Sequence, residues 1–159
     1  MSSTDDLLAN AERYAEAFEA GHLEAPPARR VAVLACMDAR LHLSELLGLG
    51  VGDAHVLRNG GGVVTEDVLR SLGISQRRLG TTEVMVVQHT SCGMTGIDED
   101  ALEAEIGRRP AEGFGGFDDV EASVRDGVRR IRESPYLLHT DHVRGFIYDV
   151  KTGRLREVD

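Results

Sequence analysis

The stretch that decides the fold is Val31-Ala-Val-Leu-Ala35, a short apolar run that leads into a cysteine, Cys36. Its length and its polar flanks predict a strand buried on both faces of a sheet. Two similar runs follow at 54–57 and 84–87, and stretches with helical periodicity separate the three runs. Strands that alternate with helices in this way predict an α/β fold with a mostly parallel central β-sheet flanked by helices.

The same pattern continues to the C-terminus. Apolar residues at helical spacing predict one helix that starts after Thr65 and another over 120–131. The segment 143–150 predicts a further strand, and a Lys-Thr-Gly turn separates it from a short final strand over 154–158. No internal repeat or low-complexity linker interrupts the chain, so we predict a single domain over residues 1–159.

Residues 1–27 are predicted to form a helical arm outside the sheet, and residues 30–159 form the core. Ser3 and Thr4 can cap a helix in this arm. One face of that helix is apolar, with residues at helical spacing: Leu7, Ala11, Tyr14 and Phe18. The arm can pack either on its own core or on a second subunit.

Composition and charge limit the class of protein. The chain has 159 residues, 42% of them apolar, which is enough for one buried core. The formal net charge of −9 disfavours nucleic acid and anionic membranes as partners, because both attract basic surfaces. The N-terminal residues are acidic where a signal peptide is basic, and no apolar stretch approaches the roughly twenty residues of a membrane span. We therefore expect a cytoplasmic protein whose two cysteines are reduced.

Unusual residues follow three of the predicted strands. The first strand leads into Cys36-Met-Asp38-Ala-Arg40, the second into Arg58-Asn-Gly60-Gly61-Gly62 and the third into His89-Thr-Ser-Cys92. In open parallel sheets, ligands gather beyond the carboxyl ends of the strands. Both cysteines and a histidine are therefore expected at one edge of the sheet.

These three residues suit a metal ion. His89 and Cys92, at His-x-x-Cys spacing, can bind one ion from a single turn, and Cys36 can add a second thiolate from a neighbouring strand. Two sulfurs and one nitrogen suit zinc, and three protein ligands leave the fourth position open, as a catalytic zinc requires. Two other interpretations remain open: inert buried cysteines beside an unrelated histidine, or a redox pair of Cys36 with Cys92.

The motifs as a set resemble those of the β-class carbonic anhydrases. Ala35-Cys-Met-Asp-Ala-Arg-Leu41 is similar to the first signature of that family, Arg58-Asn-Gly-Gly-Gly62 to its Arg-Asn-Ala-Gly loop, and His89-Thr-Ser-Cys-Gly93 to its second zinc motif. The likeness spans about residues 30–150, and it is greatest to a compact bacterial subgroup that includes mycobacterial members. It implies Zn²⁺ bound by Cys36, His89 and Cys92, and a homodimer or homotetramer with the active-site cleft between subunits.

The resemblance also implies an activity, the reversible hydration of CO₂ to bicarbonate and a proton by zinc-bound hydroxide. Asp38 and Arg40 would be the catalytic pair. Paired with Arg40, Asp38 accepts the proton of the nucleophile; released from Arg40, Asp38 can become the fourth zinc ligand and close the site. Two thiolates cancel the charge of Zn²⁺, so we expect the activity to rise toward alkaline pH.

The loop Gly60, Gly61 and Gly62 precedes a helix, and its backbone N–H groups suit a small anion such as bicarbonate. A plain tight turn is an equally good interpretation, and Arg58 is interpreted as a structural partner. Gly60 stands where the family usually has alanine. The chain has no tryptophan, so we do not expect the form of bicarbonate inhibition that uses one.

Two alternative functions are compatible with these motifs. A hydrolase of carbonyl sulfide or carbon disulfide would use the same zinc and the same nucleophile, and would differ only in its approach channel. A non-catalytic zinc-binding or thiol redox protein would not need the Asp38–Arg40 pair beside an open metal position.

Overall fold

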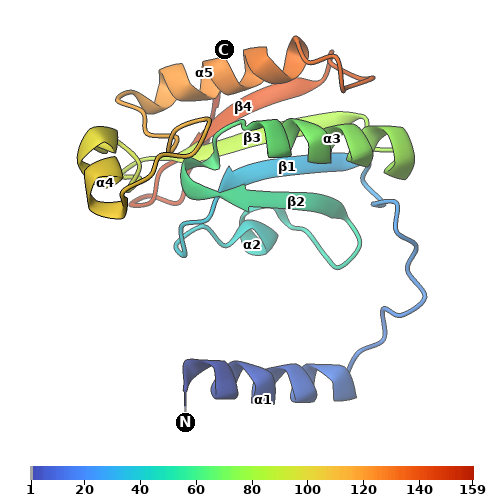
Figure 1. Cartoon of the computed structure of the whole chain (residues 1–159). Helices are drawn as coiled ribbons and strands as arrows, with labels where there is room; N and C mark the ends of the chain where they lie inside the picture. The colour runs from blue at the N-terminus through green and yellow to red at the C-terminus, as the bar shows by residue number, and fades with distance from the viewer. Residues whose placement is uncertain (1) are drawn as a thin grey trace.

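The computed structural model describes residues 2–159 and contains one five-stranded sheet (Figure 1). Its strands are β1 (Val31–Cys36), β2 (Ala54–Asn59), β3 (Glu83–His89), β4 (Val143–Tyr148) and β5 (Leu155–Val158). Its helices are α1 (Ser3–Glu16), α2 (Leu43–Leu47), α3 (Glu66–Leu79), α4 (Glu99–Ile106) and α5 (Val120–Arg132), with a 3-10 turn η1 (Gly60–Gly62). The strand order is β2-β1-β3-β4-β5, and only β5 runs antiparallel to its neighbour. The prediction of an α/β fold with a mostly parallel sheet is confirmed.

Strand β1 is covered on both of its faces. Ala32 and Leu34 are fully buried on one face, in a core that α3 and α5 complete. Val33 and Ala35 point to the other face, where Leu43 of α2 covers them. An apolar run without alternation is what a parallel strand buried on both faces requires.

The ends of the elements follow from local hydrogen bonds. The Thr65 hydroxyl accepts a hydrogen bond from the N–H of Val68 at 3.3 Å, so α3 begins where the sequence predicts. Helix α1 begins one residue earlier than predicted, because Ser2 and Asp5 form a reciprocal capping box that Ser3 and Thr4 do not. Strand β4 ends at Tyr148, two residues before the predicted boundary, because Asp149 starts a turn.

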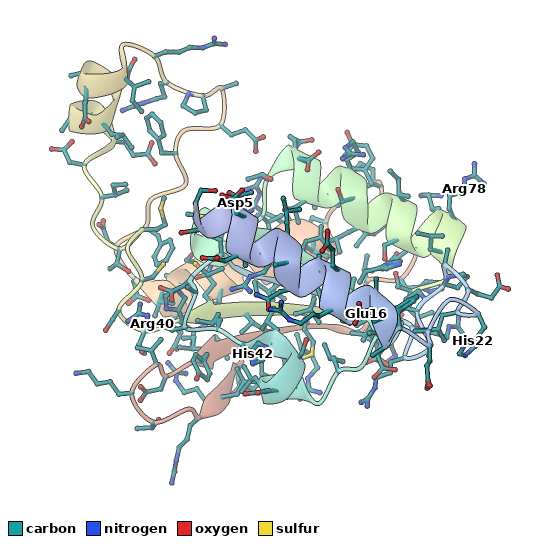
Figure 2. The ribbon with its side chains drawn as sticks, turned by 90° about the horizontal axis from the view of Figure 1, so that it is seen from below. Asp5, Glu16, His22, Arg40, His42 and Arg78 are labelled. Carbon is teal, nitrogen blue, oxygen red and sulfur yellow. The ribbon has the colours of Figure 1, made fainter. Side chains whose placement is uncertain are left out.

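Helix α1 stands apart from the sheet, as the predicted arm does (Figure 1). None of its residues is buried, and Leu7, Leu8 and Tyr14 are 67%, 60% and 58% exposed. Seen from below, α1 lies in front of the sheet with Asp5 and Glu16 near its two ends (Figure 2). Its apolar face therefore has no partner within residues 2–159. Among these residues, no helix is both long and apolar enough to cross a membrane.

Candidate metal centre

The three motifs converge because β1 lies between β2 and β3. In the parallel register, Cys36 at the end of β1 stands opposite Asn59 at the end of β2. Ala35 stands opposite Val87, so that His89 ends β3 at the same edge of the sheet. The prediction that the cysteines and the histidine meet at one edge is confirmed.

Cys36, His89 and Cys92 form a compact cluster. Their ligand atoms lie within 4.8 Å of one another, and the two Sγ atoms are 3.9 Å apart. All three side chains are buried, at 4%, 0% and 7% exposure. Within the described residues 2–159 this is the one cluster of such side chains with the spacing of a metal site.

A hydrogen bond to the backbone decides which ring nitrogen of His89 can bind a metal. Its Nδ1 lies 2.9 Å from the carbonyl oxygen of Thr90, and a carbonyl only accepts, so Nδ1 carries the proton. Nε2 then bears the lone pair, and this buried atom has no hydrogen-bond partner in residues 2–159. Thr90 is itself fixed, because its N–H donates to Tyr148 O at 2.9 Å and its Oγ1 accepts from Val150 N at 3.2 Å. A buried nitrogen with a bare lone pair between two thiols fits a zinc ion.

The electrostatics of the thiols agree with this assignment. Burial raises the pKa of the Cys92 thiol above its ordinary value, and the neighbouring Cys36 adds to the effect. A thiolate at this place therefore needs a cation to compensate its charge. Zinc supplies that charge and deprotonates a coordinating thiol outright.

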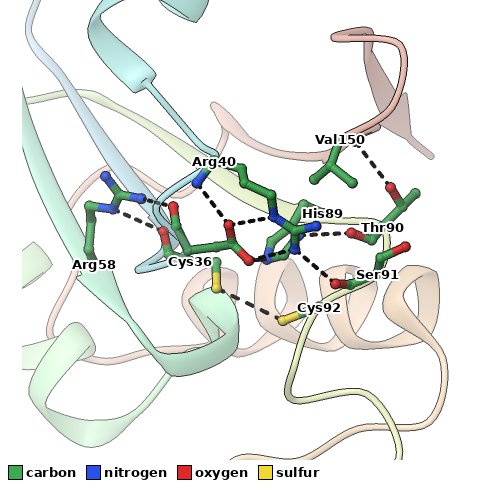
Figure 3. A network of polar contacts seen from close by, with 9 residues as sticks. Cys36, Arg40, Arg58, His89, Thr90, Ser91, Cys92 and Val150 are labelled. Atoms are coloured by element: carbon green, nitrogen blue, oxygen red, sulfur yellow. Dashed lines mark hydrogen bonds and ion pairs between the residues drawn. The ribbon is translucent and has the colours of Figure 1, made fainter.

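Arg40, labelled in Figure 3, forms an ion pair with Asp38 beside the cluster. Arg40 Nε donates to Asp38 Oδ1 at 2.9 Å and Nη2 donates to Oδ2 at 2.7 Å, which is the bidentate geometry that arginine favours. These bonds, together with the Arg40 N–H, hold the pKa of Asp38 far below its ordinary value. Asp38 Oδ2 is also 3.7 Å from His89 Nε2, too far for a hydrogen bond but adjacent to the ligand cluster. An ionised carboxylate thus lies next to the place that a metal would take.

A family model described as carbonic anhydrase matches residues 31–113. The chain is 48% identical to "Beta-carbonic anhydrase 1" of Mycobacterium tuberculosis, over 99% of both chains. The crystal structure of a carbonic anhydrase from Streptococcus mutans superposes with a TM-score of 0.91 and 41% identity, over 100% of this chain and 99% of the other.

The chain belongs to the β-class carbonic anhydrase family.

It is also 33% identical to a carbon disulfide hydrolase of Acidianus sp., over 83% of this chain and 78% of that protein. The resemblance stated from the motifs is confirmed, and the Cys-His-Cys cluster is typical of the zinc site of β-carbonic anhydrases.

Within this β-carbonic anhydrase, Arg58 supports the site from the side opposite Arg40 (Figure 3). Its Nε donates to the carbonyl of Cys36 at 2.9 Å, and its Nη2 donates to the carbonyl of Asp38 at 2.8 Å. Arg58 therefore fixes the backbone that carries one cysteine and the carboxylate. The structure agrees with the interpretation of Arg58 as a structural partner, although the sequence does not identify the two carbonyls.

The glycine loop lies directly against Cys36. Gly62 has φ +63°, and a Cβ atom there would lie 2.7 Å from the backbone nitrogen of Cys36. At Gly60, by contrast, a Cβ would meet only Met94 Sδ at 3.6 Å and Met37 Cε at 4.0 Å. The position that departs from the family's alanine is thus the one with room for it. Whether the loop binds an anion stays a prediction.

Apolar side chains that the sequence analysis did not identify enclose the thiols. Met94 and Phe117 pack against Cys36, Cys92 and Leu41. Both also line a cavity of about 730 Å³ between α5 and residues 94–119, whose wall includes Gly60. The lining of this cavity includes Met94 and Phe117 but none of the three ligand residues, so the cavity lies beside the cluster.

Proposed function

We propose that this chain hydrates CO₂ reversibly to bicarbonate and a proton, with Zn²⁺ held by Cys36 Sγ, Cys92 Sγ and His89 Nε2. The observation that carries the proposal is the unpartnered, fully buried Nε2 of His89, which lies between two thiols and next to the Asp38 carboxylate. When bound, zinc supplies a hydroxide nucleophile by lowering the pKa of a coordinated water.

The residues of the chain would position that nucleophile. Arg40 keeps Asp38 ionised and bound at both oxygens, so Asp38 Oδ2 can accept a hydrogen bond but cannot donate one. That acceptor, beside His89 Nε2, would orient the lone pair of the nucleophile toward CO₂. Met94 and Phe117 pack against the cluster that contains the two thiols, and the amides of Gly60–Gly62 would receive the bicarbonate product.

The test is stopped-flow CO₂ hydration by protein of known zinc content, from about pH 7 to about pH 9. We expect a rate that rises with pH, because two thiolates reduce the acidity of a water bound to zinc. Since the pKa of Asp38 is held far below this range, the rise would not report Asp38. Cys92→Ser should abolish the activity. A protein with one zinc per chain and no activity at any pH would refute the proposal.

Hydrolysis of carbon disulfide or carbonyl sulfide is the second candidate. One observation favours it, the 33% identity to a carbon disulfide hydrolase of Acidianus sp.. Parallel assays of CO₂, carbonyl sulfide and carbon disulfide with one zinc-loaded preparation would decide between the substrates. A higher kcat/KM for either sulfur compound than for CO₂ would favour this candidate.

We further propose that residues 1–159 form one domain that assembles as a homodimer or homotetramer. The support is the exposed apolar face of α1 and the 47% exposure of Val56 on the edge strand β2, since an isolated helix of this length is marginal in water. Light scattering of the intact protein and of Tyr14→Asp would test the assembly; a monomeric wild type would refute it.

The two free thiols also support a reducing compartment such as the cytoplasm.

A further inference from the structure

The backbone of Ser91 adopts a conformation that its residue type disfavours. Ser91 has φ +53°, and only Arg30 shares a positive φ among the non-glycine residues of the described chain. L-residues avoid this region, and where they occupy it at a functional site the strain often has a role. The Ser91 side chain is exposed, so contacts of that side chain with a core do not account for the conformation.

The conformation does account for the position of a carbonyl group. Arg40 Nη2 donates to the Ser91 carbonyl oxygen at 3.0 Å, and the same nitrogen donates to Asp38 Oδ2 at 2.7 Å. The guanidinium group is therefore held between the turn that follows β3 and the loop that follows β1 (Figure 3). Arg40 thus bonds both segments, in addition to the contact between the Sγ atoms of Cys36 and Cys92.

The residues on each side of Ser91 are already fixed. The Thr90 N–H, carbonyl and hydroxyl bond Tyr148, His89 and Val150 in turn. After Ser91, the carbonyl of Cys92 accepts from Thr95 N at 3.1 Å. With both neighbours fixed, the direction of the Ser91 carbonyl depends on the torsion angles of Ser91 itself.

We propose that Ser91 is a positioning residue, whose left-handed backbone presents its carbonyl to Arg40 and thereby keeps Asp38 paired and away from the metal position. The inference rests on the proposed function and adds to it a residue that acts only through Arg40.

The pair needs this additional support because it is accessible to water. Arg40 is 51% exposed, and an ion pair so exposed is weakly held on its own. A further acceptor for the charged guanidinium removes its freedom to rotate away. Without it, Asp38 would be released beside His89 Nε2, 3.7 Å away, where it can compete for the fourth metal position.

The test compares Ser91→Val with Ser91→Gly. Valine adopts positive φ poorly, whereas glycine adopts it freely and keeps the carbonyl. We expect Ser91→Val to lower kcat/KM about tenfold, mainly through kcat, and to retain one zinc per chain. The conservative variant Ser91→Gly should keep kcat/KM within about twofold of the wild-type value. Should the valine variant not fold, the milder β-branched Ser91→Thr replaces it in the comparison.

A double-mutant cycle separates positioning from a general disturbance of the turn. In an Arg40→Ala background, Ser91→Val should change kcat/KM by less than about twofold, because its target is gone. A full tenfold loss in that background, or loss of zinc, would mean that Ser91 acts through Cys92 and would overturn the proposal. So would an equal loss in the glycine and valine variants.

A second readout does not depend on CO₂ hydration. Azide binding to the cobalt(II)-loaded protein, followed by visible absorption, reports whether the fourth metal position is open. Ser91→Val should raise the azide dissociation constant about tenfold, and Ser91→Gly should not. An unchanged azide affinity in Ser91→Val would overturn the proposal. A wild type that binds azide but fails to hydrate CO₂ would refute the proposed function and leave this test valid.

Discussion

Two glycines of the turn η1 provide a matched pair of substitutions, Gly62→Ala and Gly60→Ala. The two positions are two residues apart and receive the same added methyl group. At Gly62 the new Cβ would lie 2.7 Å from Cys36 N, 3.0 Å from Ala35 C and 3.1 Å from Val87 O. All three neighbours are backbone atoms of the central strands, so no side-chain rotation can relieve the overlap.

The size of the effect follows from two contributions. An L-residue at φ +63° costs about 1–2 kcal/mol relative to glycine. Overpacking against a well-packed backbone adds about 1–3 kcal/mol, so Gly62→Ala should lower the free energy of unfolding by about 2–5 kcal/mol. At Gly60 the methyl group makes only ordinary contacts with Met94 and Met37, and φ is not positive. Gly60→Ala should therefore raise stability by about 0.4–1 kcal/mol, through the lower entropy of the unfolded chain.

Urea unfolding of both variants, with zinc content measured in parallel, checks these values. For a chain of this size the loss at Gly62 corresponds to a decrease in Tm of roughly 4–20 °C. We also expect less than one zinc per chain in Gly62→Ala, because relief of the overlap displaces Cys36. A Gly62→Ala variant with the Tm and zinc content of the wild type would refute the steric reasoning. So would a Gly60→Ala variant that is destabilised as strongly.

Three further outcomes are expected. Arg58→Met should weaken zinc binding about 10- to 100-fold in a chelator competition, because it frees the carbonyls of Cys36 and Asp38; a wild-type affinity would contradict the role of Arg58. Leu72→Ala, at a fully buried site of α3 remote from the ligands, should lower the free energy of unfolding by about 2–5 kcal/mol in urea and leave the zinc content at the wild-type value. Hydrogen bonds from the Gly116 N–H and neighbouring amides lower the pKa of Glu99. The stabilisation of the loop by Glu99 is therefore complete above the unfolded pKa of this carboxyl, and it is lost as the pH falls through the lowered folded pKa. Hydrogen exchange at the Gly116 amide should show protection in the wild type that declines over this acid range, and little protection at any pH in Glu99→Ala.

The sequence predicts the ligand cluster because local rules place it there. Apolar runs without alternation predict parallel strands, and the residues that follow parallel strands meet at one edge. Cys36 and His89 are the last residues of β1 and β3, so the strand boundaries alone bring them together. The pairing of Asp38 with Arg40 is equally local, since they lie two residues apart.

The supporting contacts could not be predicted, because they depend on long-range geometry. The bond from Arg40 to Ser91 joins residues 51 positions apart, and serine is not a residue type that indicates positive φ. Arg58 is part of a recognisable motif, but its bonds to two carbonyls depend on the register of β2 with β1. For Met94 the only signal was an apolar residue shortly after the second zinc motif.

This arrangement explains why one edge of the sheet can provide both the metal ligands and the contacts that set the position of Asp38. The end of β1 provides a thiol, Cys36, and the loop that follows provides a carboxylate, Asp38, while the turn after β3 provides Cys92 and the carbonyl of Ser91. A bound metal would join the two segments through their sulfurs, and Arg40 joins them through Asp38 and Ser91. A change at Ser91 that redirects its carbonyl therefore acts on Asp38 through Arg40. Variants of Ser91 and of Arg40 should consequently change the position of the carboxylate while the zinc content stays at one per chain.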